Sequence, residues 1–181
     1  MYMPLATADV WEIAGNFEPC RLFGCLPLIC VSDDILILGS YWVQKDIAQS
    51  LMAIEIELPE GEKPFASSFD INRREYPEGR FYVFHPGESQ LETLALLSRT
   101  FKGGVEKDIF FDHLLLYRSG TPLVPLLYFH DAFMGGTLYL SGHYSEKVIH
   151  LFASSLGATA RLVDNPDLRI EKQASIRKEE L

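Results

Sequence analysis

The sequence contains few features of the kind that identify a function directly. It has only three cysteines, Cys20, Cys25 and Cys30, and no Cys-x-x-Cys pair. An odd number of cysteines and the lack of a signal peptide indicate a reducing, cytoplasmic setting rather than a disulfide-stapled secreted domain. Positions five apart on a strand face opposite sides, so these thiols would make a poor metal cage, and we expect small buried side chains.

Long apolar runs are also missing. The longest run, from Leu22 to Val31, covers about ten residues and contains Pro27, so it is too short to span a bilayer. Basic side chains are in the minority: 16 lysines and arginines stand against 25 aspartates and glutamates, for a net charge of −9. A field of that sign repels phosphate backbones. We therefore expect neither a nucleic acid nor a membrane as partner.

Motifs of the common catalytic classes are absent. The sequence holds no Gly-x-Ser-x-Gly elbow, Walker loop, dinucleotide fingerprint or His-Glu-x-x-His. What is present is ordinary: 48% of the 181 residues are hydrophobic and 23% are charged. A chain of this size and composition can bury a core without disulfides or metal. The missing signature favours a binding protein over an enzyme.

Apolar periodicity divides the chain into alternating strands and helices. Strands are expected at 21–31, 34–39, 53–58, 80–85, 108–118, 122–131, 136–142 and 158–163, and helices at 7–16, 40–53, 86–104 and 145–157. Pro122 and Pro125 place the strand at 122–131 toward a sheet edge. We predict an α+β or mixed α/β sandwich with one mixed sheet of about six to eight strands and two to four helices, including an antiparallel hairpin at residues 108–130.

The domain organisation expected from the sequence is simple. Residues 1–163 form a single globular domain. Within it, residues 59–79 are rich in proline, glycine and charge and are typical of a long surface loop. From Asp164 onward nine of eighteen residues are charged, which predicts a flexible C-terminal tail over 164–181.

Residues 141–150, Ser-Gly-His-Tyr-Ser-Glu-Lys-Val-Ile-His, space His143, Glu146 and His150 like metal ligands. However, Ser145 is a good N-cap, so a helix begins near Glu146, and helical phase puts His150 opposite the apolar side. Glu146 and His150 then form a solvent-facing pair, and His143 precedes the helix. A zinc site needs three or four well-placed ligands. We therefore predict no metal site here and keep His143 and Tyr144 as candidates.

Two further signals pair histidine with aspartate. Asp112 and His113 interrupt an apolar strand, and adjacent residues on a strand face opposite sides. One of them is a site residue with a perturbed pKa, or both are structural on a half-exposed strand. His130 and Asp131 lie where a strand enters a glycine loop, and a histidine near a carboxylate is typical of general bases. The alternative for this pair is a strand end with capping polar groups.

His85 ends a strand directly before a helix, with Glu88 in the first turn, and His143 holds the same position in its own strand–helix unit. In open α/β sheets, ligands gather outside the carboxyl ends of strands, against helix N-termini. If the two strands run parallel and close together, His85 and His143 meet at one edge. His130 joins them only if its strand ends there as well.

Three functional hypotheses remain. The leading one is a small soluble acidic binding or regulatory protein that acts through protein–protein contacts or self-association, with no cofactor. The alternative is a small histidine-dependent hydrolase or lyase, with a divalent metal as its potential cofactor. Its catalytic candidates are His85, His130, Asp131 and His143, and the binding candidates are Glu88, Asp112, His113 and Tyr144. The third is a small-molecule anion sensor that uses the helix N-termini near Gly87 and Ser145.

Overall fold

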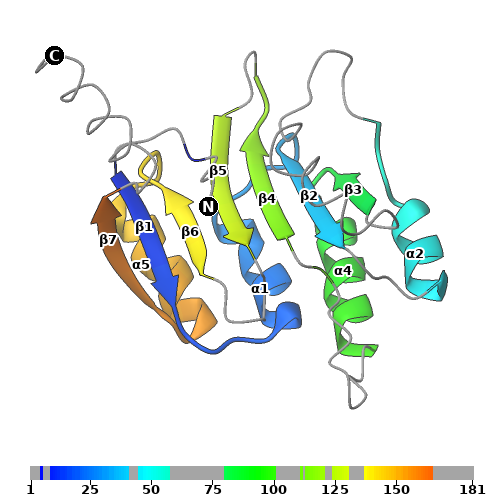
Figure 1. Ribbon diagram of the computed structural model, residues 1–181, viewed down its shortest axis with the longest axis horizontal. Helices are drawn as coiled ribbons and strands as arrows, with labels where there is room; N and C mark the ends of the chain where they lie inside the picture. The colour runs from blue at the N-terminus through cyan, green and yellow to red at the C-terminus, as the bar shows by residue number, and fades with distance from the viewer. Residues whose placement is uncertain are drawn as a thin grey trace, which may run out of the picture.

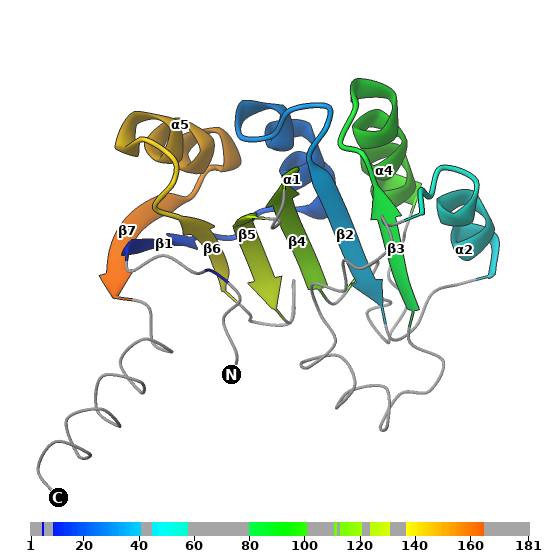
Figure 2. The same cartoon turned by 90° about the horizontal axis from the view of Figure 1, so that it is seen from above.

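A computed structural model describes residues 5, 9–40, 45–57, 80–100, 111, 113–120, 124–130 and 137–164. In these residues seven strands form one sheet, with helices packed on one of its faces (Figures 1 and 2). The strands are β1 (Asp9–Ala14), β2 (Ile35–Ser40), β3 (Arg80–Phe84), β4 (His113–Arg118), β5 (Val124–His130), β6 (Leu138–Ser141) and β7 (Thr159–Asp164). The helices are α1 (Pro19–Cys25), the 3-10 turn η1 (Leu26–Leu28), α2 (Lys45–Met52), α4 (Glu88–Thr100) and α5 (Glu146–Leu156).

The strands lie in the order β3-β2-β4-β5-β6-β1-β7. Each neighbouring pair is antiparallel. The structure confirms the predicted α+β class, number of strands and hairpin, here β4–β5. The sheet was predicted to be mixed but is wholly antiparallel. β1 pairs with β6 on one side and β7 on the other, so an N-terminal strand lies between two C-terminal ones.

Alternation of strand direction gives the sheet two distinct ends. At one end β3, β4, β6 and β7 finish while β1, β2 and β5 begin; we call it the Asp34 end, because Asp34 immediately precedes β2. At the opposite end β4 begins and β5 finishes; we call it the His113 end. Helices α4 and α5 follow β3 and β6, so both helices start at the Asp34 end.

Both faces of the sheet carry buried apolar side chains. On the helix side Leu36, Leu38, Leu114 and Leu116 join the larger core, which Leu22, Phe23, Leu94, Ile149 and Phe152 complete from the helices. Ile35, Ile37, Leu115 and Tyr117 alternate with them and belong to a second cluster on the other face. The central strands are therefore continuous apolar runs rather than half-wet alternations.

Three segments differ from the sequence prediction. Residues 7–16 were expected to be a helix, but 9–14 form β1, in which Val10 belongs to one buried cluster and Ile13 to the other. The apolar run at 21–31 was expected to be a strand, but Pro19 starts a helix instead. Residues 53–57 of the strand predicted at 53–58 form no regular strand, although the Ile56 N–H donates to the Val83 carbonyl at 2.8 Å.

The expected edge position of the strand at 122–131 is wrong, because β5 lies between β4 and β6. Pro125 is accommodated by an irregularity in the ladder: Leu116 opposes Leu127, and the next residue, Tyr117, opposes Pro125. Leu126 is the extra residue of this bulge. A proline needs no ladder hydrogen bond where a bulge interrupts the pairing, so it fits inside a central strand.

Some predictions fall outside the described residues. The loop expected at 59–79 and the tail beyond Asp164 are among them, as are Asp112, Asp131 and Pro122. Asp164 itself is the last residue of β7. In the part of the chain that the structure describes, no helix is long and apolar enough to cross a membrane.

Candidate functional site

The predicted convergence of three histidines is wrong. β3 and β6 do run in the same direction, so His85 and His143 both lie at the Asp34 end. However, β2, β4 and β5 separate their strands, and four inter-strand spacings of about 4.8 Å amount to roughly 19 Å. His130 is the last residue of β5, which runs the other way, and therefore lies at the His113 end. These histidines do not share one pocket, and their catalytic roles stay predictions.

The β4–β5 register instead brings together two signals that the sequence kept apart. His113 and His130 are directly opposed partners in this ladder. His113 is buried at the start of β4, so the expectation of a half-exposed strand does not hold there. Asp112 and Asp131 are not described, so the binding role predicted for the first and the catalytic role predicted for the second stay predictions.

His143 pairs with a residue that the sequence analysis passed over. Its Nδ1 lies 2.6 Å from the Ser141 Oγ, and its backbone N–H donates to the same oxygen at 3.3 Å. A serine beside a histidine is the usual nucleophile–base arrangement. The Ser141 side chain is fully buried, however, while His143 is exposed. The hydroxyl cannot reach a substrate, and the pair closes the turn between β6 and α5.

The richest polar arrangement surrounds Asp34, whose side chain is fully buried at the start of β2. Its Oδ2 accepts the Val31 N–H at 2.9 Å, and its Oδ1 lies 2.8 Å from the Arg118 Nε at the end of β4. The Asp34 and Arg118 side chains are close but not aligned for a hydrogen bond, so the attraction between them is coulombic. The His85 Nδ1 lies 3.0 Å from the Asp34 carbonyl oxygen.

Tyr144 extends this arrangement to the β6–α5 turn. Its hydroxyl donates to the Ile29 carbonyl at 2.7 Å, which ties the turn to the residues that follow η1. The charges of Arg118 and Asp34 also act on its phenol. We call Asp34, Arg118, Tyr144, His85 and Cys30 the strand-end cluster. Of the predicted site residues it contains His85 and Tyr144, whereas Glu88 is exposed in the first turn of α4.

The electrostatics of the strand-end cluster argue against catalysis there. Burial raises the pKa of the Asp34 carboxyl, and the Val31 N–H and Arg118 offset only part of that effect. Burial, followed by the charge of Asp34, raises the pKa of the Cys30 thiol to about 12. Burial likewise raises the pKa of Tyr144. A protonated thiol is a poor nucleophile, and a fully buried carboxyl cannot touch a substrate. The cluster joins the strand ends.

Helix α5 begins as the sequence indicated. The Ser145 side chain accepts the Val148 N–H, and Gly157 ends the helix in the left-handed conformation. The His150 Nε2 lies 3.4 Å from the Glu146 Oε1, and both side chains are more than half exposed, which confirms the surface pair. Among the described residues, no group of three or more histidine, cysteine, aspartate or glutamate side chains is placed to hold a metal ion.

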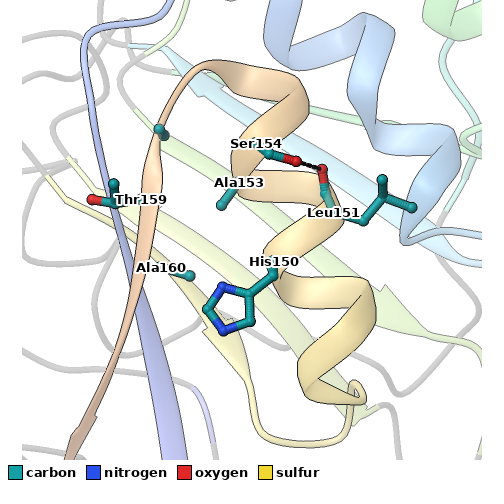
Figure 3. Close-up of a pocket in the computed structure, with 7 residues that line it drawn as sticks. His150, Leu151, Ala153, Ser154, Thr159 and Ala160 are labelled. Atoms are coloured by element: carbon teal, nitrogen blue, oxygen red, sulfur yellow. Dashed lines mark hydrogen bonds between the residues drawn. The ribbon is translucent and has the colours of Figure 1, made fainter.

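An open hollow of about 540 Å³ lies between the C-terminal half of α5 and the start of β7 (Figure 3). Its lining residues carry no carboxylate; they are His150, Leu151, Ala153, Ser154, Ala158, Thr159 and Ala160. The His150 ring extends from α5 toward β7 and packs edge-on against Trp11, with centroids 5.4 Å apart. Ser145, near which an anion site was expected, is not among the lining residues.

The sequence analysis missed this hollow because small alanine and serine side chains carry no functional signature. The apolar periodicity correctly predicted a helix and then a strand over 145–163. However, periodicity does not indicate which strand lies at the edge of the sheet. No protein-family model, curated protein or solved structure matches the chain.

Proposed function

We propose that the chain is a cytoplasmic, acidic protein-binding module that takes an extended partner segment along β7. The single observation that carries this proposal is the outer edge of β7. It is the last strand of the sheet, and none of the described residues pairs with it on its outer side. The opposite edge strand, β3, is less open because the Ile56 N–H donates to the Val83 carbonyl there. An unpaired strand edge is a template for another strand.

Side chains next to this edge suit an added strand. Leu162 of β7 is 52% exposed although it lies opposite Trp11 in the β1–β7 ladder. On the same side of the sheet, the hollow beside α5 leaves room for alternate side chains of an incoming segment. In strand addition, backbone hydrogen bonds supply affinity and such pockets supply specificity.

Local charge supports the same conclusion. The chain carries nine more acidic than basic side chains, yet the hollow is lined only by neutral residues and one histidine. Arg161 of β7 is already paired with Glu12 at 2.8 Å. Neutral surface beside an open edge lets another chain approach without electrostatic repulsion. All three cysteines are free thiols, which supports the cytoplasmic part of the proposal.

A peptide-display library of random extended segments tests this proposal without a known partner. We expect selected peptides to slow amide hydrogen exchange in β7 and to shift the NMR signals of His150 and Ser154. Counter-selection against a Leu162→Pro variant, which removes a backbone donor that faces the outer edge of β7, should eliminate these peptides. Selection that yields only peptides bound elsewhere on the chain would remove the basis of the proposal.

A further inference from the structure

We infer that the segment which β7 takes is β7 of a second copy of this chain. The inference rests on the proposed function and names its partner. Two copies related by a two-fold axis would join their sheets through antiparallel β7 strands. The six residues of β7 offer an edge of about 20 Å at 3.4 Å per residue. Closed two-fold pairs are the commonest form of self-association.

Strand geometry limits the registers that a two-fold axis allows. Successive residues direct their backbone groups to opposite edges of a strand, so only every second residue of β7 can pair outward. Residues opposed across the axis must both pair outward or both pair inward. The sum of their numbers is therefore even, and the axis passes through a single residue position. The central candidates are Arg161 and Leu162.

Charge selects between these two registers. An axis at Arg161 would oppose two guanidinium groups directly, and like charges in that position destabilise a strand pair. An axis at Leu162 opposes Leu162 with its own copy, Arg161 with Val163, and Ala160 with Asp164. No like charges are opposed in that register. The Leu162 register is therefore the one that the sequence of β7 favours.

The helix side of the joined edge gains apolar cover in this arrangement. Leu162 is half exposed, lies next to Trp11 in the ladder and would meet Leu162 of the second copy at the axis. The hollows beside the two α5 helices would flank that contact. Because their lining is free of carboxylates, two copies of an acidic chain can meet here without bringing their negative charges together.

Charge-swap variants at Leu162 test the inference. Sedimentation velocity and light scattering of the full chain should show a dimer whose fraction rises with concentration. Leu162→Lys and Leu162→Glu should each be monomeric, because each opposes like charges at the axis. Mixing the two variants should restore the dimer, because lysine then faces glutamate. Leu96→Lys is the matched control: Leu96 is exposed on α4, and this variant should remain dimeric.

The outcomes separate this inference from the proposed function. A wild-type chain that stays monomeric at all concentrations while library peptides still bind β7 overturns the second-copy inference alone. A dimer that both Leu162 variants retain also overturns it, because the copies then meet elsewhere. Loss of both the dimer and the β7 peptides overturns the proposed function as well. Far-UV circular dichroism of each variant shows whether it is folded. Slower amide exchange in wild-type β7 at high concentration shows that β7 is protected in the dimer.

Discussion

Two substitutions of Asp34 separate the cost of burying its carboxylate from the stabilisation that its contacts with the Val31 N–H and Arg118 provide. Asp34→Ala leaves the Val31 N–H, now bonded at 2.9 Å, without an acceptor in a buried site. An unsatisfied buried donor costs about 1–3 kcal/mol. The Arg118 side chain is 42% exposed and can turn to water, so the cost of about 3–5 kcal/mol for breaking a fully buried pair does not apply. We expect the free energy of unfolding to fall by about 1–3 kcal/mol, with Tm lower by about 2–4 °C per kcal/mol.

Asp34→Asn isolates the ionisation, because the amide keeps an acceptor oxygen and loses the charge. Burial raises the folded-state pKa of Asp34, whereas in the unfolded chain the pKa is about 3.9. Between the two values the folded protein binds more protons than the unfolded chain, so wild-type stability falls as the pH rises through that window. The unfolding free energy of the wild type, relative to that of Asp34→Asn, should therefore increase as the pH drops from neutral toward about 4.

Urea unfolding at each pH, followed by tryptophan fluorescence and far-UV circular dichroism, measures this difference. Other carboxyl groups titrate in both proteins and cancel when the two curves are subtracted. Asp33→Asn is the matched control, because Asp33 is the exposed neighbour and this variant removes one negative charge while leaving the Asp34 carboxyl and its contacts in place. If the Asp34 difference moves against the wild type at low pH, the backbone hydrogen bonds to the carboxylate and the charge of Arg118 together outweigh burial, and the reasoning is refuted.

Three further substitutions test contacts around α5 by the same unfolding measurement. Tyr144→Phe should lower stability by about 0.5–1.5 kcal/mol, because the Ile29 carbonyl loses its donor; an unchanged midpoint would mean that water replaces the hydroxyl. Ser145→Ala should cost about 0.5–2 kcal/mol, because the Val148 N–H loses the Ser145 side chain as its acceptor. If Ser145→Asp, which keeps an acceptor oxygen, is as unstable as Ser145→Ala, the capping role is contradicted. Phe152→Ala should cost about 3–5 kcal/mol, because Phe152 is fully buried in the core under α5; a cost below about 1 kcal/mol would show that the core closes the cavity.

The sequence predicted best where each element keeps one environment along its length. Helix α5 has a capping serine, one apolar side and a terminal glycine, and all three could be recognised in the sequence. β1 was read as a helix because it lies between two strands with both faces buried: Val10 and Ile13 belong to clusters on opposite sides, which hides the alternation. The run at 21–31 was read as a strand because a short apolar run does not distinguish a buried helix from a strand.

The candidate sites depended on strand order, which local patterns do not contain. Asp34 and Arg118 lie far apart in the chain and meet only because β2 and β4 are neighbours. His85 and His143 were correctly placed at carboxyl ends of strands of like direction, but the three strands between them could not be foreseen. The same holds for β7, whose pattern predicts a strand and says nothing about a free edge.

The position of β1 has a consequence for how the chain reaches this structure. β1 takes its place only between β6 and β7, so ladder contacts such as Val10 with Ser141 and with Val163 span almost the whole described chain. Contacts of such long sequence separation are typical of slow folding. During synthesis the first strand must wait for the last two to leave the ribosome. We expect nascent chains that stop before β6 to leave the apolar residues of β1 without their native partners, open to chaperones and to aggregation.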